Sequence, residues 1–328
     1  LAFLSCLAGE MVDVATAGEA PAATLPTGGR IVAGAGEIEQ SGASMTIRQS
    51  TEAMIAEWRS FSIGTGASVS FVQPSETSVA LNRVIGEDPS LILGSLSANG
   101  RIFLVNPSGI VFGEGASVDT RGLVASTLEI ANADFFSGIH SGTYRFTGGG
   151  GPAINRGDLQ GSVVALIAPE VRNEGRIAGD AALAAGTEVT LELGSSGLVR
   201  VWVDGSNVAS LVENGGLIQS DGGLVVLTAR GAGEALRGVV NNTGRIEARR
   251  LAEQDGRILL LADMAYGEVR AGGVLAAPFV ETSAGEVTVD PALVVETEGG
   301  EWLIDPVDIV IDGRLATAIE TALGSGNV

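Results

Sequence analysis

The pattern Asn-x-Gly-x-Ile/Leu occurs four times between residues 155 and 246, and it constrains the fold of this chain more than any other feature. The Asn and Gly residues of its copies are Asn155 and Gly157, Asn173 and Gly175, Asn214 and Gly216, and Asn242 and Gly244. Aliphatic residues that alternate with small or polar ones flank each copy, as they do in β-strands. Because Asn and Gly both tolerate the left-handed backbone conformation, each copy predicts a sharp corner between two strands.

A second pattern, a Gly followed by alternating aliphatic residues, comes after three of these corners at Gly161-SVVALIA, Gly223-LVVLTA and Gly256-RILLLA. Each unit therefore predicts a strand, a turn, a strand and a longer corner. The irregular spacing is not that of a propeller or a leucine-rich repeat, and it indicates a parallel β-solenoid with coils of roughly 20 to 30 residues. We expect insertions at Ser137–Gly151 and Arg249–Gly256, and Asn side chains that bond the backbone of the neighbouring coil.

Composition supports a stacked β architecture and excludes several classes of partner. The chain has 328 residues, among them 48 Gly, and only 4% of its residues are aromatic. Such a chain buries many small side chains and few large ones, which favours a repetitive stack over a compact enzyme core. Its net charge of −20 argues against binding to nucleic acids, which requires a basic surface, and against adsorption to anionic membranes.

Few residues are suited to catalysis or metal binding. The single cysteine, Cys6, excludes an intramolecular disulfide, and with the single histidine, His140, it excludes a His/Cys zinc site. The sequence has no G-x-S-x-G or H-E-x-x-H motif and no calcium-binding nonapeptide repeat. We therefore expect no enzyme activity, no cofactor and no metal. The alternative is a β-helical carbohydrate-active enzyme that uses clustered carboxylates, for which the candidates are Glu286, Asp290, Glu296 and Glu298.

Two short segments predict turns. Pro107 cannot pair inside a central strand and Gly109 tolerates a positive φ, so Asn106-Pro107-Ser108-Gly109 predicts a turn between the strands 102–105 and 110–112. The Asn106 side chain is suited to bond the backbone two residues later. Arg156-Gly157-Asp158 spells the integrin-binding tripeptide, but it occupies one of the Asn-x-Gly corners, and we interpret it as structural.

These segments stand in a longer ordered series. The series runs through TLPTGGRIVAGAGEIEQSG (Thr24–Gly42), WRSFSIGTGASVSFVQPS (Trp58–Ser75), VALNRV (Val79–Val84), GRIFLVNPSGIVFG (Gly100–Gly113), NADFFSG (Asn132–Gly138), YRFTG (Tyr144–Gly148) and GGEWLIDPVDIVI (Gly299–Ile311). It resembles the secretion domain, or haemagglutination activity domain, of two-partner-secretion exoproteins of Gram-negative bacteria, the filamentous-haemagglutinin type of adhesin.

The resemblance implies a fold: a right-handed parallel β-helix with an N-terminal cap and small extra-helical antiparallel β elements. We expect helix only in caps and near Leu315–Leu323. It also implies two secretion motifs, made of Asn82, Arg83, Asn106, Pro107, Gly109 and Ile110. The first motif departs from the Asn-Pro-Asn-Leu of some members, because residues 80–84 read ALNRV.

The implied partner is an outer-membrane β-barrel transporter whose periplasmic domains capture the extended chain. The implied location is the cell surface or the medium. We expect a leader or signal-peptide remnant at 1–22, the secretion domain at 23–295, and the truncated start of a downstream adhesin region at 296–328. Any host-cell or glycan receptor is left to regions beyond Val328. The front end of a contact-dependent toxin carrier is an alternative that would differ only in those regions.

Overall fold

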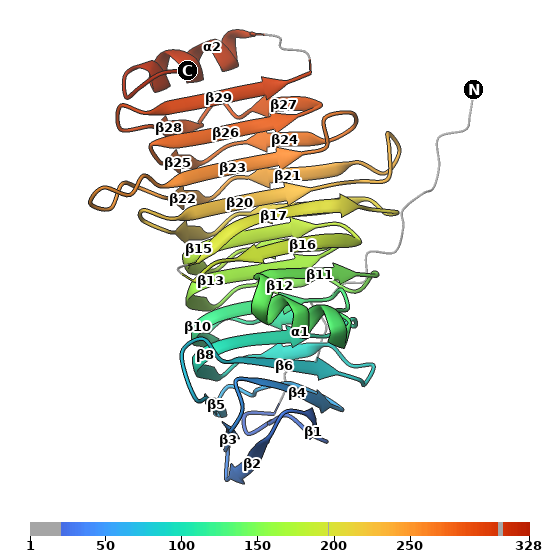
Figure 1. Cartoon of the computed structure of the whole chain (residues 1–328). Coiled ribbons are helices and arrows are strands. Elements are labelled where there is room, and N and C mark those ends of the chain that lie inside the picture. The colour runs from blue at the N-terminus through green and yellow to red at the C-terminus, as the bar shows by residue number, and fades with distance from the viewer. Residues whose placement is uncertain (1–20, 196, 308–310) are drawn as a thin grey trace, which may run out of the picture.

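Residues 21–195, 197–307 and 311–328 are described by a computed structural model, in which the chain winds into a tapering stack of β coils (Figure 1). Within these ranges nearly all strand pairs are parallel, and only the first strands and an outer sheet pair antiparallel. The fold is a parallel β-helix, as the sequence predicts. The expected leader lies outside the described residues except for Pro21 and Ala22, and the boundary expected at 295/296 stays a prediction.

The β-helix has three faces, each made of parallel strands. The first face consists of β3 (Ser44–Gln49), β5 (Ser68–Val72), β19 (Leu217–Gln219), β22 (Arg245–Glu247), β25 (Val274–Ala276) and β28 (Val294–Glu296). The second consists of β4 (Ala53–Trp58), β6 (Val79–Val84), β20 (Leu224–Ala229), β23 (Arg257–Ala262), β26 (Phe279–Ala284) and β29 (Glu301–Pro306). The third consists of β7 (Ser90–Ile92), β9 (Ile110–Phe112), β12 (Ala153–Asn155), β14 (Glu170–Asn173), β18 (Ser210–Asn214), β21 (Gly238–Asn242), β24 (Glu268–Ala271) and β27 (Glu286–Val289).

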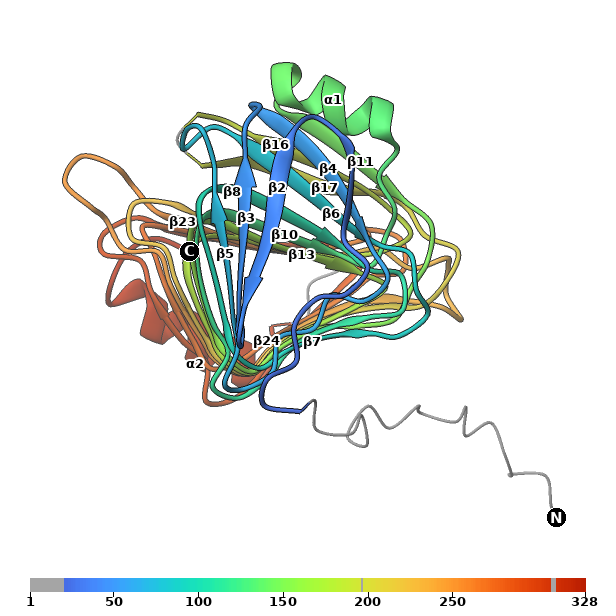
Figure 2. The same cartoon turned by 90° about the horizontal axis from the view of Figure 1, so that it is seen from below.

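Four long strands connect the first face to the second without a break. They are β8 (Ser95–Val105), β10 (Ser117–Ser126), β13 (Asp158–Ala168) and β15 (Arg176–Ala185). Each bends in its middle, where the pairing register shifts between Thr120 and Gly122 and between Gln160 and Val163. These bends form one edge of the three-sided outline that is visible along the stack (Figure 2).

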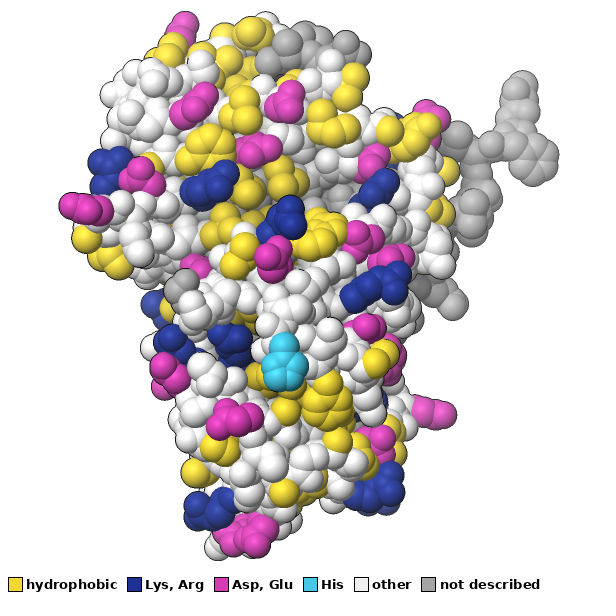
Figure 3. Space-filling view, viewed as in Figure 1, with side chains coloured by type: hydrophobic (Ala, Val, Ile, Leu, Met, Phe, Trp, Pro, Cys, Tyr) yellow, Lys and Arg dark blue, Asp and Glu magenta, His cyan; other side chains and the backbone are white. Residues whose placement is uncertain are grey.

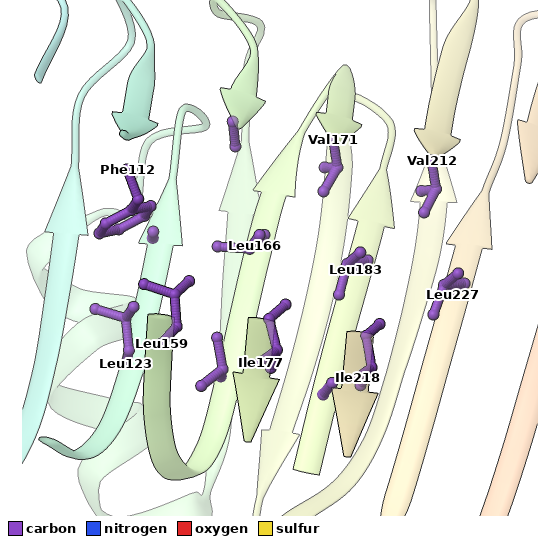
Figure 4. Close-up of a cluster of buried hydrophobic side chains, with 14 of the residues drawn as sticks. Phe112, Leu123, Leu159, Leu166, Val171, Ile177, Leu183, Val212, Ile218 and Leu227 are labelled. Atoms are coloured by element: carbon purple, nitrogen blue, oxygen red, sulfur yellow. The ribbon is translucent and has the colours of Figure 1, made fainter. Parts of the chain in front are cut away.

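Aligned aliphatic side chains fill the interior (Figure 4). Leu159 pairs with Ile177, which in turn pairs with Ile218, and all three are fully buried. Because each residue packs on its counterpart one coil away, burial of apolar area at about 25 cal/mol per Å² accumulates with every coil.

Both ends of the stack are covered. At the N-terminal end, β1 (Arg30–Ala33) lies antiparallel to β4, and β2 (Gly36–Ser41) forms a hairpin with β3. At the other end, α2 (Gly313–Leu323) packs against β27 and β28, and Asp312 caps its N-terminus. This confirms the cap and the helix expected near 315–323. Within the described residues, no helix is both long and apolar enough to span a membrane.

An antiparallel sheet of β11 (Thr143–Thr147), β16 (Glu188–Leu193) and β17 (Leu198–Gly205) lies outside the second face, together with α1 (Asn132–Ser141) (Figures 1 and 2). These elements cover outward-facing side chains such as Phe103 and enclose a second hydrophobic core, to which α1 contributes Phe135. The prediction that helix is confined to caps and 315–323 is wrong for α1. That segment has no side-chain cap at its N-terminus and carries Gly138 in its interior, so tertiary packing rather than local propensity makes it helical.

Candidate functional site

The first implied motif lies on β6, where Asn82 points into the core. Its fully buried Oδ1 accepts a hydrogen bond of 3.0 Å from the indole Nε1 of Trp58, and its Nδ2 donates to the carbonyl oxygens of Ala80 and Phe103. An indole N–H buried without a partner would be costly, so Asn82 stabilises Trp58 in the interior. The sequence gives no sign of this pair, because its two members are 24 residues apart and aromatic–amide contacts have no sequence pattern.

The next residue, Arg83, points outward and holds the start of the α1 segment. Its guanidinium donates to the carbonyl oxygen of Ile130 at 2.6 Å and to Oδ1 of Asn132 at 2.9 Å. It also lies 3.4 Å from the carboxylate of Glu129, with 15% of its side chain exposed. Hydrogen bonds that involve a charged donor contribute more than neutral ones, so Arg83 connects β6 firmly to a segment nearly fifty residues later.

The second motif forms the predicted turn, and Asn106 organises it. The Asn106 Oδ1 accepts from the backbone N–H of Ser108 at 3.0 Å, which closes the turn locally. Its Nδ2 donates to the carbonyl oxygen of Asp88 at 3.0 Å and to Oγ of Ser90 at 2.9 Å, both in the preceding coil. The side chain is fully buried. One amide therefore fixes the turn and also attaches it to the coil below.

Backbone contacts hold the rest of this turn between two coils. Gly109 has a φ of +124°, which residues with side chains rarely adopt, and its carbonyl oxygen accepts from the N–H of Ser90 at 3.0 Å. On the other side, the Pro107 carbonyl oxygen accepts from the N–H of Gly151 at 2.8 Å, and Ile110 N–H donates to the carbonyl oxygen of Pro152 at 3.0 Å.

The fold brings the two implied motifs together. Strands β6 and β8 are neighbours, and residues 79–83 pair with 101–105, so the turn begins directly beyond the strand segment that lies beside Asn82. Both motif amides, those of Asn82 and Asn106, are fully buried. The folded domain consequently presents neither of them to a partner.

The four corner asparagines form a continuous ladder through the interior of the third face. The Nδ2 of each donates to the Oδ1 of the next, from Asn155 to Asn173 at 2.8 Å and then to Asn214 and Asn242 at 2.7 Å each. The last amide donates to the carbonyl oxygen of Gly272 at 2.6 Å. All four side chains are fully buried. The expected bonds to the backbone of the neighbouring coil occur from Asn242 to Gly272 and from Asn155 to the carbonyl oxygen of Arg176 at 3.3 Å, and the amide-to-amide bonds along the ladder add to them.

The corner glycines are required by close stacking. Gly157, Gly175, Gly216 and Gly244 are absent from the residues with positive φ, so the left-handed conformation expected at these corners is not what selects them. A Cβ atom on Gly175, Gly216 or Gly244 would lie 2.1–2.3 Å from the carbonyl oxygen of the corner glycine one coil below. No side chain fits in that space.

The integrin-type tripeptide is part of this stack. Arg156 Nε lies 2.8 Å from the Glu174 carboxylate, and the Asp158 carboxylate lies 3.0 Å from Arg176, so both charged residues pair with the next coil. Gly157 between them is buried under the stacking just described.

The candidate catalytic carboxylates do not converge. Glu286 pairs with Arg237 at 3.4 Å, whereas Glu296 and Glu298 both pair with Arg249 at 2.7 and 2.8 Å. Asp290 instead accepts from the backbone N–H of Ala292. The only histidine is exposed near the end of α1, on the face where Figure 3 shows mixed apolar and charged side chains. No group of three or more potential metal ligands occurs among the described residues.

One buried titratable group belongs to the second core. Burial raises the pKa of the Tyr144 hydroxyl to about 12, an effect that the nearby positive charge of Arg101 partly offsets. The ring packs against Phe103 with 4.8 Å between centroids. Tyr144 is therefore part of the support of the extra-helical sheet, and it is neutral at physiological pH.

A model of the TPS secretion domain family matches residues 17–277. Two proteins that are each named heme/hemopexin-binding protein, both from Haemophilus influenzae, match the chain in sequence. One is 35% identical over 255 residues, which are 74% of this chain and 28% of the relative. The other is 33% identical over 248 residues, which are 67% of this chain and 26% of the relative. The chain thus spans about a quarter of the length of these curated relatives.

Two solved structures share the fold. The HMW1 secretion domain from Haemophilus influenzae superimposes with a TM-score of 0.74 at 28% identity, over 85% of this chain and 76% of that one. The filamentous hemagglutinin secretion domain gives a TM-score of 0.55 at 14% identity, over 85% and 99% of the two chains, and supports the fold alone.

Proposed function

The chain belongs to the TPS (two-partner-secretion) family of secretion domains, and on that premise we propose that a cognate outer-membrane β-barrel transporter recognises it before it folds. Secretion domains of this family are parts of exoproteins exported across the outer membrane. We place the recognition at the segments around Asn82 and Asn106. Complete burial of both amides supports this order of events, because the folded domain offers neither side chain for contact. The periplasmic domains of the transporter would bind the extended chain, and strand addition suits its alternating apolar segments.

Folding then takes place outside the cell. Each new coil buries aliphatic side chains on the coil before it, so folding disfavours the return of the chain through the membrane. The turn at Asn106–Gly109 contributes to this step, since it joins the coil that precedes it to the one that follows.

What the exported protein does depends on regions outside this chain. We propose an adhesin or haemagglutinin, which is the class implied by the ordered series of segments from Thr24 to Ile311. Heme or hemopexin binding is a second candidate, favoured by the names of the two curated relatives. A contact-dependent toxin carrier is a third. We propose that the module itself is not an enzyme. Of its four candidate carboxylates, Glu286 pairs with Arg237, Glu296 and Glu298 pair with Arg249, and Asp290 accepts from a backbone N–H, so they do not form one catalytic group.

The test of the secretion role is export of the chain with and without its transporter. The wild-type chain should reach the medium only when the transporter is present. Gly109→Val should remain largely in the periplasm, because a β-branched residue is strained at a φ of +124°. Ser108→Ala is the matched control in the same turn, since only its backbone N–H takes part in the turn. Equal release of the wild-type chain without the transporter would refute the proposal.

A further inference from the structure

A polar groove runs along the stack on the outside of the bend between the first and second faces. It consists of two adjoining hollows of about 610 and 410 Å³ that share Ser162, Arg176, Ala178 and Gly179. The groove crosses β10, β13 and β15, passes the turn between β19 and β20, and ends at the loop before β23. We call it the axial groove. With coils about 4.8 Å apart, it extends over roughly 20 Å.

The axial groove is built into the fold. Gly161, Ala178 and Gly179 line its floor, and a Cβ atom on Gly179 would lie 1.8 Å from the carbonyl oxygen of Gly161, so no side chain fits at that position. Asp180 fixes both walls, because its carboxylate accepts from the backbone N–H of Leu198 at 2.9 Å and of Leu224 at 3.0 Å. Leu198 begins the extra-helical strand β17, and Leu224 begins β20. The loop between β22 and β23 projects from the stack at the far end (Figures 1 and 2).

The side chains along the groove are hydrogen-bonding groups of several kinds. They include the amides of Gln219 and Gln254, the carboxylates of Asp221 and Asp255, and the guanidinium of Arg257. Arg257 lies 4.9 Å from the centre of the Phe279 ring and has no ion-pair partner among the described residues. Thr120, in the wall of the lower hollow, is 4% exposed, and its hydroxyl has no hydrogen-bond partner in the part of the chain described.

These features select a class of ligand. The backbone groups of β10, β13 and β15 are already paired on both sides, so a peptide has no free strand edge to join. Among the described residues that line the two hollows none is aromatic, so a flat apolar ligand has no surface to stack on there. A chain with a net charge of −20 disfavours a polyanion. A long, neutral ligand with many hydroxyl groups matches amide, carboxylate and guanidinium side chains.

We propose that the axial groove of the folded domain binds a linear, uncharged oligosaccharide. Gln219 and Arg257 contact it near the upper end, and Arg176, shared by both hollows, contacts it in the middle. This role belongs to the folded module and is independent of export, so it adds an interaction with a glycan surface to the secretion role.

Titration calorimetry on the purified folded chain tests this with three neutral hexasaccharides, cellohexaose, maltohexaose and chitohexaose, and with tetragalacturonate as the acidic comparison. We expect at least one neutral hexasaccharide to bind with a Kd of about 1 mM or lower, the range of a few side-chain hydrogen bonds. Gln219→Ala and Arg257→Ala should each weaken that binding at least about tenfold. Arg156→Ala, which removes a half-buried arginine outside the groove, should leave that binding unchanged.

Thermal unfolding of each variant confirms that the fold is intact. Absence of binding by all three neutral hexasaccharides at 10-fold the expected Kd, tighter binding of tetragalacturonate, or equal binding by the groove variants and the wild type would each overturn the proposal. Because the assay uses no transporter, its outcome is separate from that of the export experiment.

Discussion

Replacement of Asn106 by Ala should destabilise the domain by about 3 kcal/mol. The side chain makes three hydrogen bonds, to Asp88, Ser90 and Ser108, and a neutral hydrogen bond contributes about 1 kcal/mol net. The residue is fully buried, so water does not readily replace the lost partners. The N–H of Ser108, partly buried, would be left without its acceptor.

The assay is urea unfolding of purified variants, followed by circular dichroism. Asn106→Ala should lower the unfolding midpoint, whereas Ser108→Ala should change the free energy of unfolding by less than about 0.5 kcal/mol. If Asn106→Ala also changed the free energy of unfolding by less than about 0.5 kcal/mol, Asn106 would not be the residue that holds the turn.

The same variant separates folding from recognition in export. Asn173→Ala, in the ladder, also loses two buried hydrogen bonds, but it lies outside the implied motifs. If the motif acts only through folding, release of the two variants should fall in proportion to their losses of stability. A much larger fall for Asn106→Ala indicates recognition by the transporter. Normal release of Asn106→Ala, at a reduced stability like that of Asn173→Ala, would remove the support for a secretion motif at this turn.

Three further perturbations test other parts of the structure. Gly216→Ala places a Cβ 2.1 Å from the carbonyl oxygen of Gly175, so the coils must separate, and we expect a loss of about 2 kcal/mol in urea unfolding; an unchanged midpoint would contradict the stacking argument. Because the pKa of Tyr144 is raised from 10.0 to about 12, its neutral form stabilises the fold fully below pH 10, and this contribution falls as the pH rises toward 12. Tyr144→Phe should therefore flatten the loss of stability between pH 10 and 12, and a slope equal to that of the wild type would exclude this role. Arg83→Met removes the bonds that hold the start of α1, so amide hydrogen exchange in α1 should accelerate while exchange in β13 stays slow; equal protection of α1 in both proteins would show that Arg83 is dispensable there.

The periodic part of this structure was predictable, and the contacts between distant segments were not. The Asn-x-Gly corners and the Gly-aliphatic strands repeat, so their pattern indicates coils, and the loop at 249–256 follows from a break in that pattern. The outer strands β16 and β17 show the same alternation of apolar and polar residues as the strands of the coils, so periodicity does not distinguish them from the coils.

The candidate site shows the same division. The turn at Asn106–Gly109 was predictable because proline and glycine leave few backbone choices. The bond between Asn82 and Trp58 was not, since a buried amide and an exposed one look alike in a sequence. The helix α1 was also missed, because the packing of Phe135 against Phe103, 5.7 Å between ring centres, outweighs its weak helical propensity.

The asparagine ladder has a consequence for how the chain avoids misfolding. Aliphatic stacks accept almost any neighbour of similar size, so a coil displaced by one position along the axis would still pack. The asparagine amides do not tolerate such a displacement. On the third face, Asn155 pairs with Phe112 in the coil before it, and Asn242 pairs with Ala271 in the coil after it. Neither Phe112 nor Ala271 has a side-chain group that forms a hydrogen bond with an amide. A slip by one coil would thus bury an amide without its partner at an end of the ladder, at a cost of about 1–3 kcal/mol. The four residues therefore favour one register of the coils. This matters in a solenoid whose coils differ in length, because successive ladder residues are 18, 41 and 28 residues apart and a regular repeat does not set the register.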